Sequence, residues 1–319
     1  MPDSRAPHFT SFNYTGQRDG PRLIVLGAVH GNETCGTRAI GRVLAELDSG
    51  ALRIAAGGLT LVPVANPLAY AKGERAGERN LNRNLFPNPT PRDFEDRVAN
   101  WLCPLLARHD VLLDLHSFNA HGEAFALVGP RDNNGALEPF AHAASERALA
   151  RRLGVRRIVD GWLATYGDGV RRRTADTLDG TLQTRLRDGV GTTEYMRSTG
   201  GYALTLECGQ HADPAAPAVA YRAIHNTLAF LGLVDAPAPP VVSPIEALSM
   251  VAVHDKIDAG DAFSRTWSSF DRVARGQLIG RRADGSPVLA EFDAWMLFPD
   301  SAAAPGSEWF FLARDNPGF

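Results

Sequence analysis

Short apolar runs alternate with longer stretches of helical periodicity between residues 22 and 232, and this alternation constrains the fold more than any other feature of the chain. The apolar runs predict strands at 22–29, 59–65, 111–115, 124–128 and 202–208. Apolar residues at helical spacing predict helices at 34–47, 91–108, 136–153 and 214–231. Strands interleaved with helices of this length predict an α/β sheet with helices on both faces.

A proline-rich segment ends this alternation. Residues 235–244 (DAPAPPVVSP) contain four prolines, which neither a helix nor a central strand tolerates. After it come short β-like pieces separated by Gly and Asp turns, with a hairpin signal at 283–286 (ADGS). The 319 residues therefore predict an α/β domain at 1–235, a linker at 236–244, and a small all-β barrel or sandwich at 245–319.

Charge and hydropathy exclude several classes of function. The 33 Lys and Arg against 36 Asp and Glu give a net charge of -3, so we expect no nucleic-acid partner. No apolar run approaches the roughly 20 residues that span a bilayer, and MPDSRAPHFTSFNYTG at the start lacks the apolar core of a secretion signal. Three scattered cysteines favour a reducing compartment. We expect a cytoplasmic protein with no membrane partner.

His30 and Glu33 lie in the run HGNE, where the first predicted strand gives way to a helix. In open α/β sheets, ligand sites cluster outside the carboxyl ends of the strands. A His and a Glu three residues apart on such a turn can bind one metal ion, and neighbouring glycines let the backbone turn tightly. The alternative is an ordinary helix start with Glu33 in its first turn.

A second histidine, His116, follows the predicted strand 111–115 in the run DLHS. On its own it is more often a hydrogen-bonded strand end than a ligand. Together with His30 and Glu33 it makes a two-His, one-carboxylate set, and catalytic zinc sites use three such ligands and leave a fourth position for water. Asp114 shares a strand face with His116, so it either orients the histidine or caps a neighbouring turn.

Two further groups of polar residues are candidates for the same site. Arg75, Arg79 and Arg83 lie within nine residues in a polar loop that contains the run NLNRN. Arginines beside an asparagine suit bidentate capture of a carboxylate, although a solvated loop has the same composition. Glu207 lies at the end of the strand 202–208, where a carboxylate is either a paired structural charge or a general base. The residues alone leave both alternatives open.

The order of these motifs resembles the succinylglutamate desuccinylase/aspartoacylase family, a branch of the zinc carboxypeptidase-like fold. HGNE is followed by Arg75 with NLNR and FP, then by DLHS and TLE, while FDRVARGQLIG (270–280) and LFP (297–299) extend the match to nearly the whole chain. The resemblance implies a mixed, mostly parallel sheet with helices on both faces. It also implies one zinc ion per chain bound by His30, Glu33 and His116, with Glu207 as the general base.

For the substrate, the resemblance implies that Arg75 polarises the scissile carbonyl and that Asn82 and Arg83 hold a carboxylate. Arg197, ten residues before the general base, stands where the family has a substrate-binding arginine. Asn80 departs from the family, which commonly has an acidic residue before LNR. The arginine run at 171–173 is either a solvated cluster or an attraction for an anionic substrate.

The implied reaction is hydrolysis of the amide bond of a small anionic N-acyl amino acid, which releases a carboxylic acid and a free amino acid. The C-terminal domain would narrow access to the site. A metallocarboxypeptidase or peptide amidase on the same scaffold is the closest alternative, and a binding protein that has lost catalysis is another. The loops that set acyl preference do not align, so the acyl group and the amino acid stay open, and a homo-oligomer is compatible with the sequence.

Overall fold

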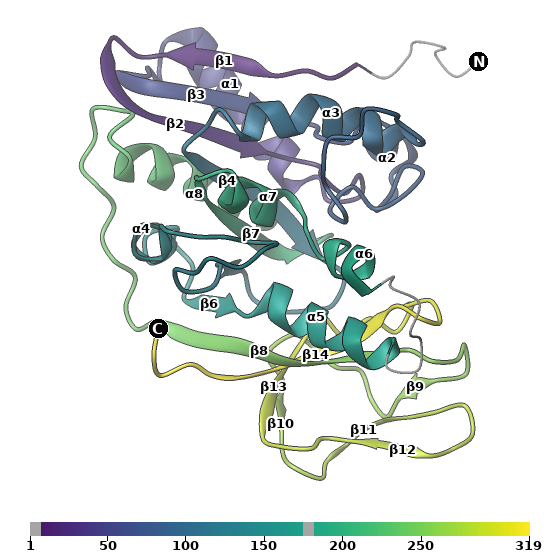
Figure 1. Cartoon of the computed structure of the whole chain (residues 1–319). Coiled ribbons are helices and arrows are strands. Elements are labelled where there is room, and N and C mark those ends of the chain that lie inside the picture. Colours follow the sequence, from purple (N-terminus) through teal and green to yellow (C-terminus); the bar gives the residue numbers. More distant parts are fainter. Residues whose placement is uncertain (1–7, 175–181) are drawn as a thin grey trace.

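The computed structural model describes residues 8–174 and 182–319, and its main element is one large mixed sheet (Figure 1). The strands of this sheet are β1 (Phe12–Thr15), β2 (Arg18–Leu26), β3 (Ala56–Val62), β4 (Val111–Phe118), β5 (Phe125–Leu127), β6 (Arg157–Asp160), β7 (Tyr202–Gln210), β8 (Glu246–Asp255), β10 (Arg272–Val273), β13 (Ala294–Leu297) and β14 (Glu308–Asp315). Their spatial order is β1-β3-β2-β4-β7-β5-β6-β8-β14-β13-β10. The predicted mixed sheet is confirmed.

The sheet contains two parallel blocks. β3, β2, β4 and β7 pair in parallel, and so do β5, β6 and β8. β5 joins the two blocks by pairing antiparallel with β7, and β14, β13 and β10 continue antiparallel beyond β8. Parallel pairing is thus less dominant than the resemblance implies, because antiparallel neighbours need only short connections whereas each parallel pair needs a long crossover.

Helices cover both faces of the parallel strands. They are α1 (Cys35–Ser49), α2 (Pro67–Lys72), α3 (Phe94–Leu106), α4 (Ala143–Ala150), α5 (Trp162–Arg173), α6 (Leu182–Arg187), α7 (Thr192–Ser198) and α8 (Ala216–Phe230). Leu23 and Val25 of β2 pack in one core with α1 and α8, whereas Ile24 and Leu26 pack in the opposite core with α3 and α7. Successive strand side chains point to opposite faces, so a strand covered on both faces is apolar throughout. None of the described helices is long and apolar enough to cross a membrane.

The C-terminal residues 245–319 form strands only, but four of these strands, β8, β10, β13 and β14, belong to the large sheet, so a separate barrel or sandwich is not confirmed. β8 pairs in parallel with β6, so the large sheet continues into this part of the chain. A second, three-stranded sheet contains β9 (Ala262–Phe263), β11 (Leu278–Arg281) and β12 (Pro287–Leu289). β8 hydrogen-bonds with the backbone of β6, which would otherwise be an unpaired edge strand. The apolar periodicity of a single strand does not show which other strand it will pair with. The domain boundary in the proline-rich linker stays a prediction.

Three parallel strands bring the candidate ligands and the candidate base to one edge of the sheet. The HGNE turn follows β2, His116 lies near the end of β4, and Glu207 lies opposite His116 on the neighbouring strand β7. This is the carboxyl edge, where open α/β sheets bind their ligands.

Candidate metal centre and active-site cavity

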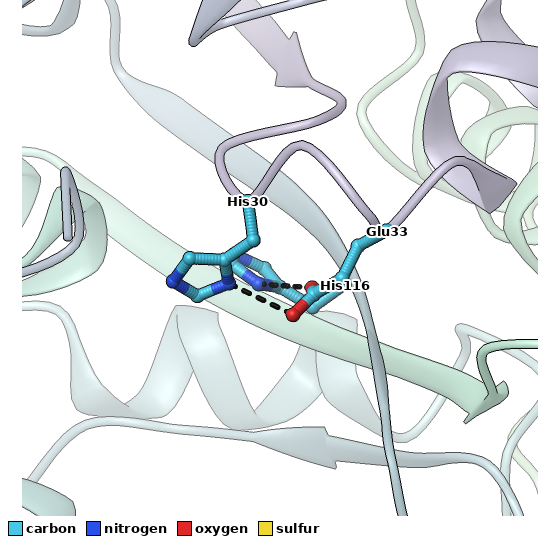
Figure 2. Close-up of side chains that lie close together, drawn as sticks. All are labelled: His30, Glu33 and His116. Carbon is cyan, nitrogen blue, oxygen red and sulfur yellow. Dashed lines mark hydrogen bonds and ion pairs between the residues drawn. The ribbon is translucent and has the colours of Figure 1, made fainter. Parts of the chain in front are cut away.

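The turn after β2 contains two tight backbone positions. Ala28 has a φ of 47°, and a Cβ at Gly31 would lie 2.0 Å from the carbonyl carbon of Ala69 in α2. Any side chain at Gly31 would therefore push α2 away. A hydrogen bond from the backbone N–H of Glu33 to the carbonyl of His30, 3.1 Å long, closes the turn. The His30 and Glu33 side chains consequently point toward one another (Figure 2).

The three candidate ligands meet at the Glu33 carboxylate. His30 Nδ1 lies 2.9 Å from Glu33 Oε1, and His116 Nδ1 lies 2.9 Å from Glu33 Oε2 (Figure 2). All three side chains are buried, and the ligand-type atoms lie within 4.8 Å of one another. The backbone N–H of Ser117 also donates to Glu33 Oε2, at 3.1 Å. Residues far apart in the sequence thus form one compact donor set.

Each histidine has an oxygen on the Nε2 side of its ring. His30 Nε2 lies 3.0 Å from Asn80 Oδ1 in a hydrogen bond, and His116 Nε2 lies 2.9 Å from Asp114 Oδ2 in an ion-pair contact without hydrogen-bond geometry. A proton held on Nε2 leaves the lone pair on Nδ1, which is the atom that faces Glu33. Two imidazole nitrogens and a carboxylate are a donor set that zinc favours, so these residues fit a zinc ion. Asn80 supplies its oxygen without the charge of the acidic residue common in the family.

The pKa values of this donor set do not shift alike: those of His30 and Glu33 fall, whereas for His116 the effect of burial is outweighed by Asp114 and Glu33, which raise its pKa well above the usual range. Burial lowers the pKa of His30 to about 4, and Arg75 adds to the effect. For Glu33, burial favours the neutral acid, but His30 and His116 outweigh it and hold its pKa well below the usual range. A neutral His30 and an ionised Glu33 suit metal binding, whereas His116 would have to release a proton when the metal binds.

Glu207 is the buried carboxylate next to the donor set. It is 8% exposed, and its Oε2 has no hydrogen-bond partner. Burial raises the pKa of Glu207 to about 8, with Glu33 adding to the rise and His116 opposing it. An unpaired buried oxygen is costly, so such an atom calls for an explanation beyond packing. A carboxylate whose pKa lies near neutrality is suited to accept and return a proton.

Arg75 approaches the donor set from the loop between α2 and α3. Its Nη1 donates to Glu33 Oε1 at 2.9 Å, while about half of its side chain, 51%, is exposed. The guanidinium therefore lies beside the candidate metal centre and keeps donors free for a ligand. Arg79, the neighbouring arginine of the sequence motif, pairs instead with Asp93 and Asp96 at the start of α3. It holds the loop in place.

Asn82 and Arg83 line the cavity on the other side of this loop. Asn82 Oδ1 accepts a hydrogen bond from the backbone N–H of Thr192 at 2.9 Å. Arg83 donates to the Asn82 carbonyl at 2.9 Å, and its guanidinium lies 4.8 Å from the ring centre of Trp162. The side chain of Arg83 is held in place by these contacts and faces the cavity.

Arg197 lies at the cavity wall, but its guanidinium is engaged by protein groups. Its Nε donates to Glu146 at 2.9 Å, its Nη1 to Glu138 at 2.6 Å, and its Nη2 to the Ala203 carbonyl at 2.6 Å. The residue is 3% exposed. This arrangement leaves little room for the substrate-binding role implied by the family resemblance.

The arginine run on α5 is likewise paired, in this case away from the cavity lining. Arg171 donates to Asp168, Arg172 to the Val253 carbonyl, and Arg173 to Asp255. The contacts of Arg172 and Arg173 join the end of α5 to β8, and none of the three arginines lines the cavity, so the run supplies no attraction for a substrate inside it.

The candidate residues surround one cavity of about 610 Å³. Its lining includes four residues that the sequence did not single out as site candidates, namely Trp162, His211, Phe298 and Glu308. His211 follows β7 and its Nδ1 lies 2.8 Å from the Ser117 hydroxyl, next to the candidate ligand His116. The only feature of the sequence that pointed to His211 as a site residue was its position four residues after Glu207. Phe298 and Glu308 come from a segment remote in sequence.

Residues 19–152 match the family described as "Succinylglutamate desuccinylase/Aspartoacylase catalytic domain". A succinylglutamate desuccinylase from Pseudomonas paraeruginosa is 32% identical over 158 residues, which are 45% of this chain and 44% of that protein. The match thus spans less than half the length of this curated relative. The family match at residues 19–152 includes all three residues of the donor set.

Solved structures share the fold over almost the whole chain. The succinylglutamate desuccinylase/aspartoacylase from Rhodobacter sphaeroides has a TM-score of 0.73 at 17% identity, over 97% of this chain and 89% of that one. The product-bound ectoine utilization protein EutE (DoeB) from Ruegeria pomeroyi has a TM-score of 0.71 at 19% identity, over 96% and 92%. The part of the chain with the donor set thus matches the catalytic-domain model of the succinylglutamate desuccinylase/aspartoacylase family, and the chain shares its fold with solved structures that carry this family's name.

Proposed function

We propose that the chain is a zinc-dependent hydrolase that cleaves the amide bond of a small N-acyl amino acid and releases a carboxylic acid and a free amino acid. The observation that carries the proposal is the unpaired, buried carboxylate of Glu207 beside the His30, Glu33 and His116 donor set. Arginines line the same cavity, which suits an anionic substrate.

His30, Glu33 and His116 would hold one zinc ion per chain. When bound, zinc lowers the pKa of water toward about 7 and polarises a carbonyl oxygen. The oxygens of Asn80 and Asp114 would keep the two imidazole rings oriented for this task.

The remaining steps belong to side chains of the cavity. Glu207 would accept a proton from the attacking water and pass it to the nitrogen of the leaving amine. Arg75 would donate to the carbonyl oxygen as it gains negative charge. Asn82 and Arg83 would bind the substrate carboxylate. We do not assign a substrate contact to Arg197, because its nitrogens already donate to Glu138, Glu146 and Ala203.

A small substrate is favoured over a polypeptide by the composition of the cavity wall. Residues 298–308 contribute Phe298, Pro299, Ala303 and Glu308 to the lining, so the C-terminal part of the chain covers one side of the site. This supports the gating role proposed for residues 245–319. A carboxypeptidase or peptide amidase would need room for a peptide chain on that side.

Metal analysis followed by a substrate screen tests the proposal. We expect about one zinc per chain and hydrolysis of at least one member of a panel of N-succinyl, N-acetyl and N-formyl amino acids. Dipeptides and peptide amides form the comparison set. Faster hydrolysis of these peptides would favour the carboxypeptidase or amidase alternative, and zinc-loaded protein inert toward both sets would favour a binding protein.

A further inference from the structure

The charged side chains of the cavity are predominantly acidic. Among the described residues, the lining contains three arginines and five carboxylates, namely Arg75, Arg83, Arg197, Glu33, Glu194, Glu207, Asp300 and Glu308. An anionic substrate is best bound in such a cavity where an arginine keeps donors that protein groups do not already occupy. The number of free arginines therefore limits the number of carboxylates that the substrate can carry.

Arg197 is not free. Glu138 and Glu146 accept its hydrogen bonds, and Glu194 lies 3.6 Å from its Nη1. Three carboxylates surround one guanidinium, so the charges around Arg197 are negative in sum. This part of the cavity therefore does not attract anions. Glu194 is itself held by the backbone N–H of Gly191 and the hydroxyl of Thr193, at 2.9 and 3.0 Å. The cluster is fixed in the fold.

Arg75 lies at the reacting centre, where Nη1 donates to Glu33 at 2.9 Å, and its remaining donors are assigned to the carbonyl oxygen that is attacked. Arg83 remains. Its guanidinium carbon lies 4.8 and 5.6 Å from the ring centres of Trp162 and Tyr166. One of its nitrogens lies 3.9 Å from Glu308. Arg83 can bind one carboxylate, and Glu308 opposes the approach of a second.

The wall formed by residues 298–308 adds no cation. Its lining residues are apolar or small except for two carboxylates, Asp300 and Glu308. An uncharged acyl group or side chain can pack on such a surface. A carboxylate would lose its water there without gaining a positive partner, which is strongly unfavourable.

We propose that the substrate is an N-acyl amino acid with a single carboxylate, bound by Arg83, and with an uncharged acyl group and an uncharged or cationic side chain. The proposal rests on the proposed function and narrows it. It assigns N-acetyl or N-formyl derivatives of non-acidic amino acids to this chain, and it excludes N-succinyl and N-acyl-glutamate substrates as the preferred ones. Glu308 is the residue that sets this preference.

Two isosteric substrates test the charge rule directly. N-acetylglutamine and N-acetylglutamate have nearly the same shape, but they carry one and two carboxylates. For zinc-loaded protein we expect kcat/KM to be at least about tenfold higher for N-acetylglutamine, because the second carboxylate meets Glu308 without a free cation. N-succinylglutamine and N-succinylglutamate, compared with their N-acetyl counterparts, test the acyl side in the same way.

The variant E308Q removes the opposing charge and keeps the shape. We expect it to reduce the preference for N-acetylglutamine over N-acetylglutamate several-fold, mainly through KM for the dicarboxylate. E291Q makes the same change at an exposed glutamate outside the cavity lining and should leave the preference unchanged. Isothermal titration calorimetry with zinc-loaded E207Q measures the binding of N-acetylglutamine and N-acetylglutamate. It determines the same preference without turnover.

The outcomes separate this inference from the proposed function. Equal or higher kcat/KM for the dicarboxylates would overturn the inference and leave the proposed deacylase function intact. An unchanged substrate preference in E308Q would have the same consequence. If no N-acyl amino acid is hydrolysed and neither ligand binds E207Q, both the function and the inference fail.

Discussion

The side-chain oxygen of Asn82 accepts a hydrogen bond from the backbone N–H of Thr192, 2.9 Å away, at the first residue of helix α7. The hydroxyl of Thr192 in turn donates to Asp114, whose carboxylate lies beside His116. One threonine therefore links the loop residue Asn82, the start of α7 and the strand β4, which carries the candidate ligand His116. Because the Asn82 oxygen is committed to this contact, the amide nitrogen is the part of Asn82 left for a substrate.

Asn82→Asp separates these two roles of Asn82. The aspartate keeps an oxygen that can accept from Thr192 at a helix N-terminus, so the melting temperature should stay close to that of the native protein. It loses the amide donor and adds a negative charge near Arg83, so KM for an N-acyl amino acid should rise about tenfold or more. Thermal unfolding and steady-state kinetics check both parts.

Asn82→Ala is the matched comparison, because it removes the acceptor as well. It should lower the free energy of unfolding by about 1 kcal/mol in addition to raising KM. If Asn82→Asp and Asn82→Ala have the same melting temperature and both keep the native KM, Asn82 neither stabilises the start of α7 nor contacts the substrate.

Removal of the metal should lower stability through mass action. Zinc at about a hundredfold excess over its dissociation constant stabilises the folded state by roughly 2.7 kcal/mol, so a chelator should lower the melting temperature by several degrees. His30→Ala should lower the zinc content and abolish this response. His225→Ala, which affects a pairing with Glu46 between α8 and α1, should retain both. Equal zinc content in the two variants would argue against His30 as a ligand.

Glu207→Gln should bind zinc like the native protein and lose nearly all turnover. The amide keeps the size of the side chain but cannot accept and return a proton, and a general base typically contributes about 10²- to 10⁴-fold to the rate. Metal analysis and kcat on one preparation make the comparison. Substantial residual activity with full zinc content would remove Glu207 from the proposed mechanism.

The sheet and much of the site follow from the sequence, because both depend on local patterns. The apolar runs at β2, β4 and β7 are long and bounded by turns, and HGNE and DLHS come directly after or at the end of such runs. The carboxyl ends of neighbouring parallel strands meet at one edge, so placing these motifs together needed only the predicted alternation. The predicted donor set is in fact compact in the structure.

Contacts between distant segments could not be predicted in this way. The pairing of β6 with β8 depends on β6 having a backbone edge that no strand of residues 1–235 occupies. Helix α5 was not predicted, because its glycines and three arginines obscure the apolar face that packs beside β8. Glu308 reaches Arg83 from 225 positions along the chain, a relationship that no spacing in the sequence encodes.

Arg197 is the residue whose implied role differs most from its observed contacts. Arg197→Met would leave the buried Glu138 and Glu146 without their common partner, which typically costs about 3–5 kcal/mol. We therefore expect a large fall in the denaturation midpoint, while the KM of the folded fraction changes little. A raised KM in a variant of native stability would instead restore Arg197 to the substrate site.

The same cluster should make stability depend on pH. Burial raises the pKa of Glu138 to about 7, and Glu194 and Glu146 add to the rise against the opposing effect of Arg197. A carboxyl with a raised pKa in the folded state favours folding when protonated, so its contribution is complete below the ordinary pKa of about 4.5 and is lost as the pH rises to 7.

Glu138→Gln keeps an oxygen acceptor for Arg197 and removes this titration. Between pH 4.5 and 7 the free energy of unfolding of the native protein should fall relative to that of the variant, by about 2 kcal/mol over the interval. Denaturant unfolding at a series of pH values measures the difference, and Glu291→Gln at an exposed position supplies the baseline. Parallel curves for native protein and Glu138→Gln would mean that Glu138 stays ionised in the fold. The arginine would then neutralise more of the cluster than the distances to its three carboxylates suggest.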